Sequence, residues 1–287
     1  MLDLSHIPNS RQDIQIFYAN GTAWQTWRKP RKCNYVWIMC IGGGAGGGGG
    51  QNLFDSVGGS GGGSGAVTRA LFNSQQLPDI LYVQVGRGGA GGANLTNGSA
   101  GTRSWVALQP AVTIIAQNII MGSGGGGAAG GQSGTGVAAA GETAITQTSA
   151  SFITLSNFIS TVGRPSTAFD GFSDWLPTNP LTSQITCPGA GGSVATGGGS
   201  IQATSISPSI PGGAVGAIGG NGSNGITSWK PFYSLGGSGG GPATAGNGGI
   251  GGNGGIGSGG GGGGSATGGQ PGRGGDGGDG LVIIISF

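Results

Sequence analysis

Charge is scarce in this chain. Asp, Glu, Lys and Arg together supply 7% of 287 residues, and the formal net charge is +2. Glu142 is the only glutamate and His6 the only histidine. Proteins that bind nucleic acid usually carry a basic face. The few lysines here are scattered and form no evident basic cluster, so the composition argues against a nucleic-acid partner.

Long apolar runs are also missing. The longest apolar stretches, residues 36–41 and 281–285, are far shorter than the ~20 residues of a membrane-spanning helix. The first six residues lack the cationic start and apolar stretch of a secretory signal. We therefore expect a soluble protein made in a cytoplasm, without membrane insertion, which would reach the outside of a cell as part of a particle.

Cysteine is rare and odd in number, at Cys33, Cys40 and Cys187. Cys33 and Cys40 are seven residues apart, so on one strand they would face opposite sides and could form neither a local disulfide nor a metal pair. We expect buried thiols that behave as small hydrophobic side chains.

Glycine, by contrast, supplies 74 of the 287 residues, in long tracts between strand-like segments. Residues 42–50 are glycine apart from Ala45, and they directly follow the apolar run 35–41. Collagen is excluded because proline is sparse and the tracts contain uninterrupted glycine runs, such as 259–264. Little charge and several aromatic residues argue against disorder.

Apolar alternation at Ile14, Ile16 and Tyr18 predicts a strand with one buried face. Helical periodicity is nearly absent, and residues 151–162 could form a short strand or a helix. The fold predicted from these patterns is all-β, with a β-sandwich or jelly-roll-like scaffold built by strands from both ends of the chain. The expected strands are residues 13–18, 23–27, 35–41, 66–72, 80–85 and 281–287, with one or two further strands from 104–108 and 112–121.

The late tracts have a period of three residues, as Gly-Gly-Ile-Gly-Gly-Asn in 248–253 and Gly-Gly-Asp-Gly-Gly-Asp in 274–279. Polyproline-II geometry has three residues per turn and makes no hydrogen bonds within itself. Glycine keeps its N–H and has no Cβ, so such helices could pack together, each bonded to its neighbours. We expect a bundle of polyglycine-II helices, with every third residue along an outer edge and pure glycine, such as 259–264, inside.

These elements form a single domain, residues 1–287. The predicted β scaffold comprises 1–41, 66–121 and 281–287; the predicted tracts are 42–65, 86–101, 122–141, 189–225 and 236–280; variable loop segments are 142–188 and 226–235.

Two motifs carry a family resemblance. The chain opens with Trp27-Arg28-Lys29-Pro30, a strand and residues 42–50, and closes with Gly-Gly-Asp-Gly and an apolar strand at 277–284. This order resembles the glycine-rich domains of bacteriophage tail-fibre and adhesin proteins. The resemblance implies a virion structural protein at a fibre tip, homo-oligomeric and commonly trimeric, exposed on the particle and able to bind a host receptor. Similar domains occur in the ectodomain of the anaplastic lymphoma kinase receptor family, whose disulfides and membrane span are not recognisable here.

The resemblance places receptor contacts on the segments between tracts. The alternative for these aromatic residues is that they cap the bundle or pack between subunits. The candidate contact residues are Phe169, Phe172, Trp175, Trp229, Lys230, Phe232 and Tyr233.

Other polar residues have ordinary structural interpretations. Asp170 and Asp174 could be a sugar-cleaving carboxylate pair, although neighbouring glycine and proline favour turns. Asp276 and Asp279 could hold a cation or serve as solubilising edge residues. Glycine-rich nucleotide motifs lack their required helix, acid or lysine. We predict no catalytic site, cofactor or metal.

The function predicted is therefore a bacteriophage tail-fibre or receptor-binding component. One alternative is a capsid-surface decoration or fibre protein without a receptor role. A second is a secreted ice-binding or surface-matrix protein, because polyglycine-II bundles can present flat faces.

Overall fold

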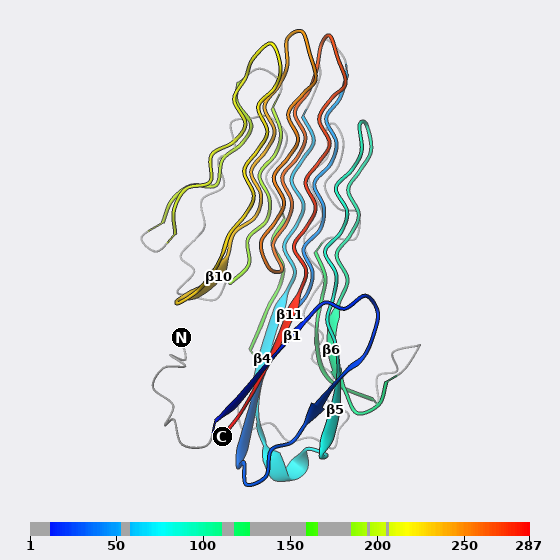
Figure 1. Ribbon diagram of the computed structural model, residues 1–287, viewed down its shortest axis with the longest axis vertical. Coiled ribbons are helices and arrows are strands. Elements are labelled where there is room, and N and C mark those ends of the chain that lie inside the picture. The colour runs from blue at the N-terminus through cyan, green and yellow to red at the C-terminus, as the bar shows by residue number, and fades with distance from the viewer. Residues whose placement is uncertain are drawn as a thin grey trace.

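The computed structural model shows a β-sandwich at one end and a bundle of extended glycine tracts at the other (Figure 1). The structure describes residues 12–52, 58–110, 118–126, 159–165, 185–193, 196–204 and 207–287.

Two antiparallel sheets form the sandwich. The five-stranded sheet has the order β1-β11-β3-β4-β8 and the four-stranded sheet the order β2-β5-β6-β7. The first sheet comprises β1 (Asp13–Tyr18), β11 (Leu281–Ser286), β3 (Tyr35–Ile41), β4 (Val67–Asn73) and β8 (Ile159–Thr161). The second comprises β2 (Gln25–Arg28), β5 (Ile80–Gln84), β6 (Ser104–Ala107) and β7 (Ile119–Ser123). A hairpin of β9 (Thr227–Trp229) and β10 (Phe232–Ser234) and a 3-10 turn, η2 (Ser74–Gln76), complete the described elements.

The core lies between the two sheets. Ile38 of β3 and Phe72 of β4 pack against Trp27 of β2 and Leu81 of β5, all at most 1% exposed. The other face of the first sheet is also apolar, with Ile41 and Ile285 in a second cluster. Strand β11 is buried along its whole length, which explains its uninterrupted apolar sequence. The all-β prediction is confirmed.

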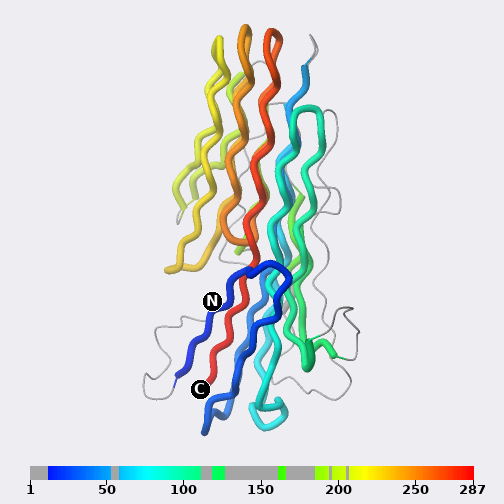
Figure 2. Tube along the Cα trace, turned by 45° about the vertical axis from the view of Figure 1, so that its right-hand side comes forward, coloured from blue at the N-terminus to red at the C-terminus, as the bar shows by residue number. Residues whose placement is uncertain are grey.

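Strands continue directly into glycine tracts where the sandwich ends. Strand β3 leads into residues 42–50, and residues 272–280 lead into β11 (Figure 2). Three consecutive amides of tract 42–50 donate to carbonyls of three different tracts. These bonds run from Gly43 to Thr102, from Gly44 to Gly278 and from Ala45 to Gly63, at 2.8–3.0 Å. The next three amides repeat the pattern, which is the three-residue period of polyglycine II.

Tract 42–50 is hydrogen-bonded to six neighbouring tracts, three through its amides and three through its carbonyls. Two further tracts, 235–243 and 258–266, have six bonded neighbours each. The neighbours of tract 42–50 are 58–66, 86–95, 96–103, 122–126, 258–266 and 270–280. The inner tracts therefore form a hexagonal lattice, and the prediction that 259–264 lies inside the bundle is confirmed.

At most inner positions only glycine permits this spacing. A Cβ at Gly47 would lie 2.0 Å from the carbonyl oxygen of Gly261, and one at Gly44 would lie 2.0 Å from that of Ser258. Both obstacles are backbone atoms held on all sides by other tracts, so no flexible side chain can move away. The same contacts recur throughout the lattice.

Several predicted boundaries change. Strand β7 runs through Gly122 to Ser123, where a tract was expected to begin, because the glycine packs against the Trp105 ring opposite it. Residues 226–235, expected as a loop, contain the β9–β10 hairpin. Residues 159–161 form a strand, whereas 142–158 and His6 lie outside the described residues.

The cysteine prediction is confirmed for Cys40 and Cys187, which are buried and free, and Cys33 is partly buried. Burial raises the pKa of both buried thiols well above their ordinary range. They therefore stay neutral and pack as small apolar groups.

The lattice predicts an unusually costly alanine substitution. Gly47→Ala should destabilise the protein by at least about 3 kcal/mol, because its Cβ has no space between two backbones. The control is Gly21→Ala, where the position is open but φ is +59° and the cost should be about 1 kcal/mol. Denaturant unfolding measures both, and equal costs would contradict the lattice argument.

Candidate functional site

The β9–β10 hairpin carries the candidate aromatic residues of the described chain. It lies beside the level at which the bundle meets the sandwich (Figure 1). Trp229 is 46% exposed and its ring packs at a tilt against that of Phe232, with ring centroids 5.3 Å apart. Lys230 is exposed as well. These two residues could contact a partner.

Tyr233 has a different environment. It is 7% exposed and packs in a cluster with Cys187, Ile201 and Leu235. Its neighbour Phe232 packs against the apolar outer face of the five-stranded sheet. Tyr233 therefore packs inside the protein and presents almost no surface to a partner. Phe169, Phe172 and Trp175, with Asp170 and Asp174, lie outside the described residues.

A second surface lies at the far end of the bundle, where three loops meet at the top of Figure 1. We call loops 214–219, 243–248 and 266–271 the distal rim. The loops are bonded to one another: the Gly246 amide donates to the Ala217 carbonyl at 2.7 Å, and the Thr267 hydroxyl donates to the Thr244 carbonyl at 2.7 Å. No residue of these three loops is charged.

The distal rim exposes apolar side chains. Ile218 is 73% exposed and Val215 is 49% exposed, and Leu95, in a neighbouring loop, is 58% exposed. This surface was not predicted from the sequence, because only aromatic residues were taken to indicate contacts. The sequence does contain a signal for this surface. Single branched residues lie between glycines at positions that do not follow the three-residue period.

Asparagine and aspartate side chains bond the outermost tracts. Asn224 accepts the Asn253 amide at 2.9 Å through its side-chain oxygen, and Asn253 in turn accepts the Asp276 amide at 2.9 Å. Asp276 and Asp279 accept the amides of Gly91 and Gly88, at 2.7 and 2.8 Å. A tract at the surface has no neighbour for every third amide, and these side chains replace it.

This finding revises the interpretation of Asp276 and Asp279. They were expected to be solubilising edge residues or cation ligands, but each pairs with a backbone amide of another tract. Asp276 also forms an ion pair with Arg273. Within the described parts of the chain, no group of three or more His, Cys, Asp or Glu residues is placed to hold a metal ion.

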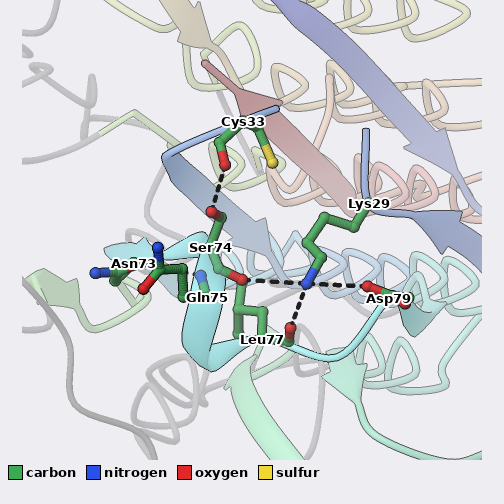
Figure 3. Close-up of polar contacts among 7 residues, drawn as sticks. All are labelled: Lys29, Cys33, Asn73, Ser74, Gln75, Leu77 and Asp79. Atoms are coloured by element: carbon green, nitrogen blue, oxygen red, sulfur yellow. Dashed lines mark hydrogen bonds and ion pairs between the residues drawn. The ribbon is translucent and has the colours of Figure 1, made fainter. Parts of the chain in front are cut away.

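The opposite end of the molecule is basic. Four of the eleven Lys and Arg residues fall within residues 28–32, in the turn between β2 and β3 at the bottom of Figure 1. The ammonium of Lys29 bonds to the Leu77 carbonyl at 2.8 Å and pairs with Asp79 at 3.0 Å, which ties this turn to the segment around η2 (Figure 3). We define Arg28, Lys29, Arg31 and Lys32 as the basic end.

The basic end corrects the earlier statement that the chain has no basic cluster. Arg28, Arg31 and Lys32 are exposed, and Lys32 adopts a left-handed φ of 67°. The signal was present as four cations in five residues, but it was interpreted only as a turn around Pro30. Lys29 alone is taken up by structural contacts.

Among the described residues, no helix is long and apolar enough to cross a membrane. In a comparison with protein families, a model described as a glycine-rich domain matches residues 19–286. A comparison with curated proteins finds no match. The family match covers the bundle and every strand of the sandwich except β1.

The hairpin predicts separable effects on stability. Tyr233→Ala should lower the free energy of unfolding by about 3 kcal/mol, because it empties a buried aromatic site. Trp229→Ala, its exposed neighbour in the hairpin, should cost about 1 kcal/mol through the lost ring contact. Chemical denaturation checks both; an equal loss in the two variants would refute the assignment of Tyr233 to the core.

Proposed function

The chain belongs to the glycine-rich domain family, and from this premise we propose that it is a non-enzymatic structural protein of a bacteriophage virion, displaying a host-contact surface on a rigid scaffold. The assignment to a bacteriophage virion and the host-contact role rest on a resemblance: the opening and closing motifs of the chain resemble those of tail-fibre and adhesin proteins. The alternative without receptor binding is a capsid-surface decoration or fibre protein.

One observation supports display above all: the distal rim sits on a three-dimensional hydrogen-bonded lattice. Each inner tract is bonded to six others, so bending one tract requires breaking bonds to several neighbours. Rim loops are also bonded to each other, which limits the ordering cost when a partner binds. Exposed apolar side chains on a rigid support are typical of recognition surfaces.

The difference in charge between the two ends of the molecule supports a defined orientation on the particle. The distal rim is uncharged and the basic end, at the opposite pole, carries three exposed cations. We infer that the basic end faces other virion proteins, through an acidic surface that would steer and orient association. The rim then faces away from the particle.

Strand β1 supports self-association. It is the edge strand of the five-stranded sheet. The prediction that Ile14, Ile16 and Tyr18 form a buried face is wrong: they are 39–54% exposed, because the opposite face, with Phe17, packs on the core. An exposed edge strand with an apolar face readily pairs with a second copy. A homo-oligomer fits this feature, and the trimer remains an expectation from the resemblance.

The regular outer face of the bundle supports a second candidate, an ice-binding or surface-matrix protein. Exposed side chains recur at every third residue, as at Asn247, Ile250 and Asn253. The neighbouring tract places Arg273 and Asp276 in the same array, so the face is chemically mixed. Thermal hysteresis of the purified protein would favour this candidate over the virion role.

Cell binding tests the display surface. We expect Ile218→Asn to reduce binding of the purified protein to host cells at least about tenfold, because it removes the most exposed apolar side chain of the rim. Ile250→Asn, 48% exposed on the side of the bundle, is the matched control and should bind normally. Immunogold labelling should place the protein on tail fibres.

Three other results have distinct meanings. Capsid labelling without cell binding would favour the decoration alternative. Normal binding by the Ile218 variant would refute the rim as the contact surface. Absence of the protein from purified virions would refute the virion role itself.

Self-association is tested by light scattering. Ile16→Asp should convert an oligomer to monomers, because it places a charge on the apolar face of the β1 edge. Ile80→Asp, 36% exposed on β5 of the other sheet, serves as control and should leave the mass unchanged. A monomeric parent protein, or an Ile16 variant of unchanged mass, would contradict this interface.

A further inference from the structure

A hollow of about 440 Å³ lies where the four-stranded sheet passes into the bundle. The loop between β1 and β2 arches beside this junction in Figures 1 and 2. The residues that line it and carry the argument are Thr22, Gln84, Arg87, Thr102, Arg103 and Trp105.

The lattice brings two arginines to the same hollow. Strand β5 leads to Arg87, and the returning tract ends with Arg103 just before β6. The two segments are tied together, because the Arg87 amide donates to the Thr102 hydroxyl at 2.6 Å and the Thr102 amide donates to the Arg87 carbonyl at 2.8 Å. Both arginine residues are exposed. Their backbones are therefore held at adjacent positions on the surface of the molecule.

Trp105 forms a fixed apolar wall beside Arg103. The Arg103 guanidinium carbon lies 5.8 Å from the centroid of the Trp105 ring, within cation–π range. The ring also packs on Gly122, where a Cβ would come within 2.4 Å of a ring carbon. Trp105 is only 6% exposed. Its ring is therefore held in place and orients the Arg103 guanidinium, rather than moving with it.

The opposite wall is anchored in the same way. Gln84 donates from its side-chain nitrogen to the Thr22 carbonyl at 2.7 Å, which holds the β1–β2 loop against the sheet. Gly21, with φ of 59°, provides the turn that this loop needs. The hollow is thus built from two pinned segments and a rigid ring.

The charge of the residues that line the hollow indicates which class of ligand it would bind. Two arginine residues line the hollow, and none of the described residues that line it is acidic. A guanidinium binds a carboxylate or a phosphate through two parallel N–H···O bonds. The Gln84 and Thr102 side chains add neutral polar groups suited to hydroxyls.

We propose that this hollow binds an oxyanion carried on a small polyhydroxyl molecule, such as a sugar acid or a sugar phosphate, with Arg87 and Arg103 as its ligands. The shared chemistry is a carboxylate or phosphate held between two guanidinium groups, with hydroxyls along Gln84 and Thr102. This site is separate from the distal rim, the basic end and the β9–β10 hairpin. It stands whether or not the protein belongs to a virion.

Titration calorimetry of the full chain at low ionic strength tests the site with inorganic phosphate, glucuronate and glucose. We expect saturable binding of phosphate or glucuronate and no binding of glucose. Tighter binding of phosphate would indicate a sugar phosphate as the ligand, and tighter binding of glucuronate would indicate a sugar acid. Arg87→Gln and Arg103→Gln should each weaken binding at least about tenfold. Arg31→Gln removes an equal charge at the basic end and should bind as the parent does.

Two further measurements guard against a structural artefact. Circular dichroism must show that each variant is folded, and Arg87→Gln, which alters no stacking contact, decides the test if Arg103→Gln fails to fold. Arg103→Lys keeps the charge but loses the paired donors, so it should weaken binding as well. Absence of saturable binding, or equal affinity of parent, Arg87→Gln and Arg31→Gln, would overturn the proposal.

Discussion

The bundle depends on one contact: a backbone amide bonded to a carbonyl of a neighbouring tract, with no side chain between the chains. The amide of Gly47 donates to Gly275 at 2.9 Å, while its Cα faces the carbonyl of Gly261 so closely that a Cβ would lie 2.0 Å from that oxygen. Glycine loses more conformational entropy on folding than any other residue. Bonding each inner tract to six neighbours makes the ordering cooperative, and this cooperativity offsets the loss.

The same contact explains how a sandwich becomes a lattice. Packed sheets stand about 10 Å apart because side chains fill the space between them. Beyond Ile41 the side chains end, so the layers approach until their backbones bond across the former gap, as Gly43 does with Thr102. A strand such as β3 has two bonded neighbours, whereas its continuation has six. The sandwich thereby sets the register from which the lattice grows.

Side-chain content made the inside and outside of the bundle predictable. Residues 259–264 have no side chain and lie inside, whereas residues 248–256 carry one at every third position and lie at the edge. Contacts that depend on which tracts become neighbours were not predictable. Asp279 accepts the amide of Gly88, which is 191 residues away, and no local pattern marks such a pair. The burial of Tyr233 and the meeting of Arg87 with Arg103 have the same non-local origin.

These constraints also limit where function can reside. Inner positions accept glycine, with alanine or serine only where a lattice gap permits, as at Ala45 and Ser238, both fully buried. Within the bundle, recognition chemistry is therefore confined to the rim loops, the outward third positions, and the junction where strands still carry side chains. Some of the outward third positions are not available for recognition either, because the side chains of Asn224 and Asp276 already accept hydrogen bonds from amides of neighbouring tracts. The rim and the junction consequently retain the greatest freedom to vary, and they hold the exposed Ile218 and the paired arginines.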